Sequence, residues 1–293
     1  MRPANSMDYI HPEDTAAFEN LQQIPGFATA LKAFMKIWNE RMIQGVNMAN
    51  KVRLGTDQLP GLYELLPPLC QSLGIDEPEF YLEMNPAPNA YTMGDSVISI
   101  TVTSGLIQLM DEEMIKAVLA HECGHIACRH VLYSTMAQLL LSAGADLLGL
   151  GVLALPLQLA LFKWQRYAEF SCDRAAAVCM QDPKPISEAL MCLAGGGKLS
   201  YGEINMDVYM QQAKDYEDIL FRSNWDKLLQ FIALMNQDHP FLSVRVSHVD
   251  SWCKTEQYTK ILQHMNGTGT GCPNCGASTE PEWKFCRHCG RPL

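Results

Sequence analysis

The sequence lacks three features that would each have pointed to a class of protein. Positive charge is scarce: 22 Lys and Arg face 32 Asp and Glu, and the net charge of -10 offers no general surface for nucleic acid. Residues 1–11 contain no apolar run behind a basic start, so we expect no secretory signal. Uninterrupted apolar runs of about 20 residues, which a membrane-spanning helix requires, are also missing.

Apolar residues and cysteines, in contrast, are plentiful. Hydrophobic residues make up 48% of the 293 residues, so the chain can bury a substantial core in one large domain, alone or beside a small one. The 11 cysteines are an odd number, and four of them gather near the C-terminus. The other seven stand in apolar or helical contexts, which indicates reduced thiols in a cytoplasmic protein rather than a disulfide framework. These seven are Cys70, Cys123, Cys128, Cys172, Cys179, Cys192 and Cys253.

The spacing of apolar residues predicts an α+β fold that is mainly helical, with a small sheet. Residues 1–15 are polar and are expected to form a loose lead to a domain over residues 16–265. Residues 266–271, Asn-Gly-Thr-Gly-Thr-Gly, read as a flexible linker to a small module over residues 272–293. Helices are expected over residues 16–52, 60–73, 111–125, 163–180, 186–197, 205–236 and 241–258, and strands over residues 79–83 and 96–103.

An uncharged stretch leaves the relation to a membrane open. Residues 131–145 and 147–162 carry no charge and are separated by Asp146. Each half is too short to span a bilayer, but together they could form one tilted span or a re-entrant hairpin. Two helices packed in a soluble core explain the pattern equally well, so membrane contact through residues 131–162 is kept as an alternative.

The most informative motif is His-Glu-x-x-His at His121, Glu122 and His125, within an expected helix that Asp111 caps. Residues four apart share one helix face, so both imidazoles can reach one metal ion. Zinc takes two such nitrogens, a further ligand and an open position for water. Cys128 and Val131 stand where a metzincin would carry Gly and His, which excludes that class.

A later helix offers the missing ligand. Glu169 and Asp173 are again four residues apart, so Glu169 is the candidate third ligand and Asp173 the candidate partner of a ligand imidazole. Two surface carboxylates are the alternative. His130 lies about 140° around the helix from His125, and it is interpreted as a solvated histidine or one that contacts a ligand, not as a ligand.

These residues suggest a hydrolytic mechanism. Zinc lowers the pKa of water, and Glu122 takes the proton as general base before passing it to the leaving amine. The oxyanion of a peptide-bond attack needs further positive partners, for which His239 and Arg245 are candidates. A helix-entry histidine and a surface arginine are the alternative interpretation of these two residues.

Several motifs occur together in a fixed order. They are Asn89-Ala90-Tyr91 with Gly94, Thr103-Ser104-Gly105-Leu106, the His-Glu-x-x-His set, Glu169 with Asp173 and Arg174, and His239-Pro240 with Arg245. With them, the chain from about Leu54 to Tyr258 resembles the HtpX-like metallopeptidases, gluzincins that include the CAAX prenyl proteases.

The resemblance implies a function for each of these motifs. It implies zinc on His121, His125 and Glu169, catalysis by Glu122, and His239 and Arg245 near the oxyanion. It also implies an extended substrate along Asn89, Ala90 and Tyr91, a segment whose pattern alone favours an ordinary connection between strands. Members of the family typically carry membrane helices, whereas this sequence has only the ambiguous stretch after the zinc helix.

The C-terminal module contains two Cys-x-x-Cys pairs, each followed by Gly. Cys272, Cys275, Cys286 and Cys289 are therefore expected to hold a structural zinc ion in a zinc ribbon. Four thiolates leave no open position, and so short a module needs the metal to fold. With a charge of +1 over residues 266–293, docking to a protein is favoured over binding to nucleic acid.

We therefore expect a zinc endopeptidase with one catalytic and one structural ion. Its substrates would be proteins or peptides, with misfolded or membrane-associated proteins among the candidates. One alternative is a non-catalytic scaffold that acts through the ribbon, and another is a zinc hydrolase that does not cleave peptides. Glu122 separates the first alternative from a protease, because a scaffold has no use for a general base.

Overall fold

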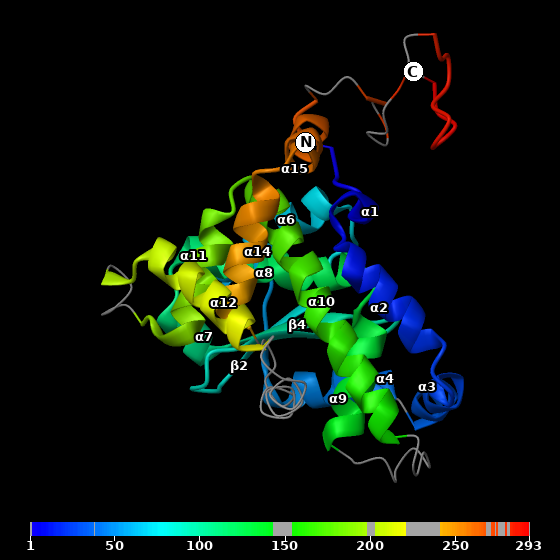
Figure 1. Ribbon diagram of the computed structural model, residues 1–293. Coiled ribbons are helices and arrows are strands. Elements are labelled where there is room, and N and C mark those ends of the chain that lie inside the picture. Colours follow the sequence, from blue (N-terminus) through cyan, green and yellow to red (C-terminus); the bar gives the residue numbers. More distant parts are fainter. Residues whose placement is uncertain are drawn as a thin grey trace.

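The computed structural model describes residues 2–37, 39–142, 154–197, 203–220, 241–267, 271, 272, 274, 279 and 282–292. The described chain is mainly helical with a four-stranded sheet, which confirms the expected fold class (Figure 1). The strands are β1 (Val52–Arg53), β2 (Glu79–Glu83), β3 (Ala90–Met93) and β4 (Ser99–Thr103). The helices are α1 (Ser6–Tyr9), α2 (Pro12–Gln22), α3 (Phe27–Ile37), α4 (Glu40–Asn50), α5 (Pro60–Tyr63), α6 (Leu66–Leu73), α7 (Ser104–Leu109), α8 (Glu112–Ala127), α9 (Val131–Ser142), α10 (Ala154–Met180), α11 (Lys184–Gly195), α12 (Met206–Leu220), α14 (Leu242–Cys253) and α15 (Glu256–Met265).

The N-terminal residues differ from the expected loose lead. Helix α2 already begins at Pro12, with His11 as its N-cap, because proline at the first helical position gives up no hydrogen bond. Tyr9 and Asp14 are 0% and 2% exposed. Buried side chains of this kind hold the segment against the body, although the polar character of residues 1–15 suggested a solvated lead.

The sheet places β3 at an edge. Its strand order is β1-β2-β4-β3, with β3 antiparallel and β2 parallel to β4. Ile100 and Val102 point into the main core, as their alternation predicts. The opposite, more polar face is also buried, because Asn47 and Lys51 from the end of α4 donate hydrogen bonds to Ser99 (3.3 Å) and Thr101 (3.2 Å).

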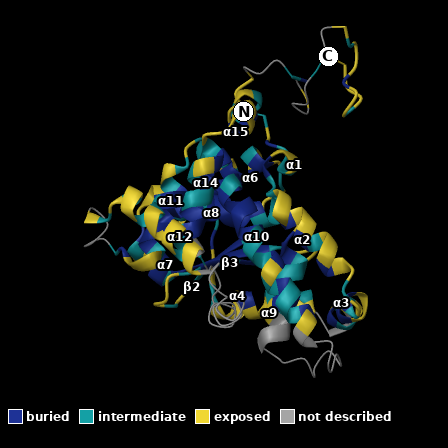
Figure 2. Cartoon of the chain, viewed as in Figure 1, coloured by how far each residue is buried: buried dark blue, intermediate teal, exposed yellow. Residues whose placement is uncertain are grey.

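Helices α8 and α10 pack side by side at the centre of the molecule, where the buried residues concentrate (Figure 2). The predicted cap of α8 is confirmed: Asp111 accepts a hydrogen bond of 2.9 Å from the backbone N–H of Met114. At the crossing, a Cβ on Gly124 would lie 2.9 Å from Cβ of Ala175 and 3.0 Å from Cα of Cys172. The absence of a side chain at Gly124 therefore lets the two helices approach closely.

A second hydrophobic cluster joins the N-terminal helices to the uncharged stretch. Leu21 of α2 and Phe27 and Phe34 of α3 pack with Met136 of α9 and Leu161 of α10. Phe27 and Phe34 thus face a core, as their helical spacing predicts; Trp38 and residues 143–153 lie outside the described residues. Among the helices described, none combines the length and apolar character needed to cross a bilayer.

Candidate active site

The structure brings the predicted metal-binding side chains together. Nε2 of His121 lies 3.5 Å from Oε2 of Glu169, and Nε2 of His125 lies 3.4 Å from Oε1 of the same carboxylate. Ligands about 2.0–2.1 Å from a shared tetrahedral zinc are themselves about 3.3–3.4 Å apart. Each imidazole of α8 therefore lies about as far from the Glu169 carboxylate of α10 as two ligands of one ion lie from each other.

Asp173 and Arg245 form hydrogen bonds and ion pairs with His121 and Glu169. Oδ1 of Asp173 lies 3.0 Å from Nδ1 of His121, the ring nitrogen opposite the one that faces Glu169. Arg245 of α14 donates to both oxygens of Asp173 at 2.6 and 2.8 Å, and its Nη1 lies 2.7 Å from Oε2 of Glu169. The alternative interpretation of Arg245 as a surface arginine is wrong, since its side chain is buried and contacts two carboxylates.

The electrostatics of the cluster suit a divalent cation. Among the described residues, three buried carboxyl groups, those of Glu122, Glu169 and Asp173, lie with one buried guanidinium, that of Arg245, so the formal charge with neutral imidazoles and no metal is -2. Burial by itself would lower the pKa of His121, but hydrogen bonds to Asp173 and Glu169 raise it to about 9. The cluster thus favours a positive charge at this position, which a zinc ion would supply in place of a proton.

Glu122 has a different environment from Glu169. Its Oε2 accepts a hydrogen bond of 2.6 Å from the hydroxyl of Thr92 on β3. Its Oε1 is buried and has no hydrogen-bond partner among the described residues. A buried polar atom without a partner is costly unless a ligand or water completes its bonding, so this oxygen marks where a reacting molecule fits. Thr92 was not predicted, because it lies 30 residues from Glu122 in no recognisable local pattern.

His130 is neither solvated nor a ligand of the set. It is 3% exposed, and its Nδ1 lies 3.3 Å from Nδ1 of His125, which corrects the solvated interpretation and supports contact with a ligand. Its Nε2 lies 3.0 Å from Oδ2 of Asp14 on α2. Burial by itself would raise the pKa of Asp14, yet bonds from His130, Ser171 and Trp164 lower it overall. Nothing in the sequence near Asp14 indicated this contact.

A buried thiol also lies beside the two imidazoles. Sγ of Cys172 and ring nitrogens of His121 and His125 lie within 4.8 Å of one another. Sγ is also 3.6 Å from Nδ1 of His130, the residue behind His125. Burial raises the pKa of Cys172 well above its usual range, so the group is a neutral thiol as long as no metal ion is bound.

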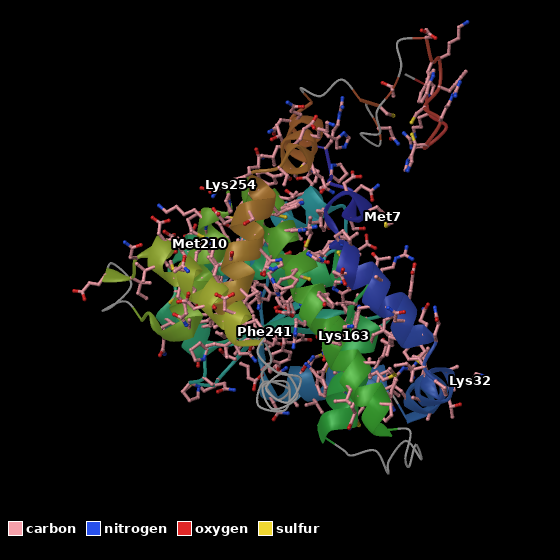
Figure 3. All side chains as sticks on the ribbon, in the orientation of Figure 1. Met7, Lys32, Lys163, Met210, Phe241 and Lys254 are labelled. Carbon is pink, nitrogen blue, oxygen red and sulfur yellow. The ribbon has the colours of Figure 1, made fainter. Side chains whose placement is uncertain are left out.

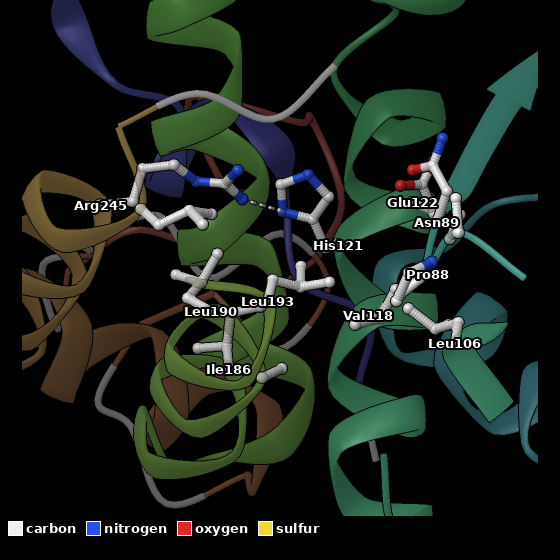
Figure 4. Close-up of a pocket in the computed structure, with 14 residues that line it drawn as sticks. Pro88, Asn89, Leu106, Val118, His121, Glu122, Ile186, Leu190, Leu193 and Arg245 are labelled. Atoms are coloured by element: carbon white, nitrogen blue, oxygen red, sulfur yellow. Dashed lines mark hydrogen bonds between the residues drawn. The ribbon is translucent and has the colours of Figure 1, made fainter. Parts of the chain in front are cut away.

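Two hollows flank Asn89 and Glu122. One, of about 260 Å³, has His121 and Arg245 at its rim and a largely apolar wall (Figure 4). The other, of about 300 Å³, has a more polar lining and reaches Glu169. The apolar wall of the first hollow consists of Leu106, Val118, Ile186, Ala189, Leu190, Leu193 and Leu242.

The predicted substrate segment lies between these hollows. Asn89 lines both, Ala90 lines the apolar one, and Tyr91 lines the polar one, where its hydroxyl donates to Glu83 at 2.6 Å. Gly105 keeps the preceding loop close, because a Cβ there would lie 2.3 Å from the backbone oxygen of Pro86. The start of β3 therefore lies between the two hollows, next to Glu122.

His239 lies outside the described residues, so its predicted role stays a prediction. Helix α14, which carries Arg245, begins directly after Phe241, which adopts a left-handed conformation with φ 63°. Figure 3 labels Phe241 at the start of α14. The guanidinium of Arg166 on α10 lies over the Phe241 ring, 4.0 Å from its centroid. This contact ties the start of α14 to α10 and thereby helps to set the position of Arg245.

The C-terminal cysteines form a second cluster. Sulfur atoms of Cys272, Cys286 and Cys289 lie within 4.8 Å of one another, whereas Cys275 lies outside the described residues. The backbone N–H of Asn274 donates to Sγ of Cys272, and that of His288 to Sγ of Cys286, each at 3.4 Å. Such N–H to sulfur bonds two residues after a cysteine suit tight turns around thiolates that hold a metal.

The parts of the chain that carry the two clusters each match a known protein family. Residues 61–253 match peptidase family M48, and residues 272–293 match a zinc-ribbon domain. The chain is 32% identical over 266 residues, 90% of this chain and 77% of the relative, to "Plastoglobule-localized metallopeptidase 48, chloroplastic" of Arabidopsis thaliana. It is 24% identical over 251 residues, 76% of this chain and 84% of the relative, to "Protease HtpX homolog" of Campylobacter concisus (strain 13826). No solved structure matches the chain. The chain therefore belongs to peptidase family M48, as an HtpX-like zinc metallopeptidase that carries a zinc ribbon.

Proposed function

We propose that this protein is an endopeptidase that hydrolyses peptide bonds within protein substrates. His121, His125 and Glu169 would hold the catalytic zinc. The distances of 3.5 and 3.4 Å from Nε2 of His121 and of His125 to the carboxylate oxygens of Glu169 support this set. Zinc, when bound, supplies a Lewis acid that polarises the scissile carbonyl and makes water acidic. Side chains of the protein would transfer the proton, bind the substrate and position the ligands.

Glu122 is the proposed general base, and the observation that carries the proposal is the contrast between its two oxygens. Thr92 holds Oε2, while Oε1 is buried beside the candidate ligands without a partner among the described residues. The free oxygen can take a proton from the attacking water and then give it to the leaving amine. The hydroxyl of Thr92 meanwhile fixes the direction in which the carboxylate points.

The surroundings of Glu122 support an extended substrate that continues in both directions. Asn89, Ala90 and Tyr91 are proposed to pair with it along β3, an edge strand. A hollow on each side of Asn89 and Glu122 would accept substrate residues on both sides of the cleaved bond, as an endopeptidase requires. The apolar hollow would take an aliphatic or aromatic side chain.

Arg245 and Asp173 are proposed to position the ligands. All three guanidinium nitrogens of Arg245 contact Glu169, Asp173 or His121 within 3.3 Å. Asp173 in turn contacts Nδ1 of His121, a carboxylate–histidine arrangement that orients a metal-binding imidazole. A contribution of Arg245 and His239 to the oxyanion stays a prediction.

Glu122→Gln tests the mechanism directly. The amide keeps the size of the side chain but cannot accept the proton, so we expect zinc content to be unchanged and cleavage of an unfolded test protein to fall at least about a thousandfold. Glu113→Gln, in the exposed first turn of the same helix, is the matched control and should retain activity. Equal activity of both variants would contradict the assignment of Glu122.

The scaffold alternative is not favoured, because a scaffold gives no reason for the arrangement around Glu122. The zinc ribbon is instead proposed as an accessory module that docks to a protein, with its metal held by the four cysteines. Cys275 completes that proposed set, which the sulfur cluster of the other three supports.

A further inference from the structure

A second line of polar contacts reaches the candidate centre from the N-terminal helix α2. Nδ1 of His125 lies 3.3 Å from Nδ1 of His130, and Nε2 of His130 lies 3.0 Å from Oδ2 of Asp14. His130 and Asp14 are 3% and 2% exposed, so water does not compete for these contacts. Asp14 lies well outside residues 61–253, the part that matches the peptidase family.

Asp14 is fixed in place by α10. Nε1 of Trp164 donates to its Oδ1 at 2.9 Å, and the hydroxyl of Ser171 donates to its Oδ2 at 2.5 Å. The same hydroxyl accepts a hydrogen bond of 2.9 Å from the backbone N–H of His11, which begins α2. These bonds dock α2 on the helix that also carries Glu169, so Asp14 cannot turn away from His130.

The proton positions along this line are determined once His125 binds a cation through Nε2. Its single proton must then lie on Nδ1, which donates to Nδ1 of His130. His130 consequently carries its own proton on Nε2, which lies 3.0 Å from Oδ2 of the Asp14 carboxylate. The Cys172 thiol, 3.6 Å from Nδ1 of His130, offers only a weak competing donor.

We propose that Asp14 and His130 are positioning residues that orient His125 for metal binding. This inference rests on the proposed role of His125 as a zinc ligand. Both ligand imidazoles would then be oriented by a carboxylate: His121 directly by Asp173, and His125 by Asp14 through His130. The N-terminal helix thereby becomes part of the metal centre, although it supplies no ligand.

A matched pair of variants at His130 tests the proposal in the full-length protein. Asparagine places its side-chain oxygen near the position of Nδ1 and keeps an acceptor for His125, whereas leucine has a similar size and no acceptor. The affinity for Co²⁺ is measured by visible absorption, which distinguishes the nitrogen–oxygen site from the thiolate site. We expect His130→Leu to weaken the former site about 10–100-fold and His130→Asn by less than about threefold.

Two further variants separate orientation of His125 from general stability. Asp14→Asn is isosteric, but it removes the charge that holds the proton on Nε2 of His130, and we expect about tenfold weaker Co²⁺ binding. Leu21→Ala removes a buried side chain of α2 but none of the hydrogen bonds of Asp14, and it should lower the melting temperature of the metal-free protein while leaving Co²⁺ affinity within about threefold. Because Asp14→Asn preserves volume, it decides the question if His130→Leu does not fold.

The outcomes distinguish this inference from the proposed function. Equal affinities of His130→Leu and His130→Asn, or an unchanged affinity of Asp14→Asn, would overturn the positioning role alone. If His125→Ala retained the nitrogen–oxygen Co²⁺ site, the proposed ligand set itself would be wrong.

Discussion

Glu122 and Glu169 are both buried next to the same imidazoles, yet their partners give them different capacities. Both oxygens of Glu169 are engaged, by His121, His125 and Arg245. Glu122 has one oxygen held by a hydroxyl and one without a described partner. A carboxylate held on both sides can bind a cation, whereas one with a free oxygen can also exchange a proton.

Replacement of Thr92 by valine should show how much this hydroxyl contributes. Thr92→Val keeps the shape but leaves both oxygens of Glu122 without a fixed donor, so kcat should fall about tenfold, equivalent to ~1.4 kcal/mol. Zinc content should change little, because the hydroxyl of Thr92 bonds to Glu122 and not to a proposed ligand, whereas KM can change because Thr92 lines the polar hollow. Steady-state kinetics with an unfolded protein substrate would measure both constants.

Thr92→Ser is the control for this substitution, because it restores the donor with one methyl group fewer. Its kcat should lie closer to that of the wild-type protein than to that of Thr92→Val. If the two variants were equally slow, packing of the methyl group rather than the hydrogen bond would explain the loss.

Sequence spacing predicts the parts of the site that repeat along one helix, but not the parts that meet across the fold. Glu169 and Asp173 are four residues apart, so their common face on α10 follows from helix geometry alone. Thr92 and Asp14 reach the site from a strand and from α2, and no local pattern marks either of them. The burial of His130 likewise depends on the docking of α2.

At the scale of whole elements, the crossing of α8 and α10 sets the distance between the candidate ligands. Gly124→Ala should push these helices apart, because the added Cβ would lie 2.9 Å from Cβ of Ala175 and 3.0 Å from backbone of α10. We expect a loss of stability of about 1–3 kcal/mol and weaker zinc binding, since Glu169 would move away from His121 and His125. Chemical denaturation and a zinc-chelator competition would measure the two effects.

Gly45→Ala on α4 is the matched control, since nothing lies within 4 Å of the added Cβ. It should be neutral or should stabilise the protein by up to about 1 kcal/mol, because alanine favours a helix more than glycine does. Weaker zinc binding in Gly45→Ala would mean that the effect of Gly124→Ala does not come from the helix crossing.

Element prediction succeeds where periodicity is strong and fails where a short segment gains its structure from docking. Capped, periodic α8 and the alternating residues of β4 follow from local sequence. Helix α2 begins within the polar residues 1–15 because Pro12 and the cap at His11 favour it and because Asp14 finds buried partners. Its polar composition, taken without those partners, indicates only solvation.

For the whole molecule, we expect two zinc ions per chain, held in separate clusters. His121→Ala should remove one ion and all peptidase activity, whereas Cys272→Ser should remove the other and leave the peptidase site loaded. Elemental analysis of the purified variants, with activity measured on the same samples, would check this. Loss of both ions from either single variant would contradict two independent sites.

Helix α10 carries two sets of contacts within ten residues. Trp164 and Ser171 anchor α2, while Glu169 and Asp173 face the imidazoles of α8. One extra residue between Trp164 and Glu169 would turn everything on one side of it by about 100° and shift it by about 1.5 Å. A substitution in this stretch changes one side chain, but the gain or loss of one residue between Trp164 and Glu169 would separate Trp164 from Ser171 and from the ligand carboxylates. We therefore expect the number of residues from Trp164 to Asp173 to be more strongly constrained in evolution than the identity of most residues within this segment.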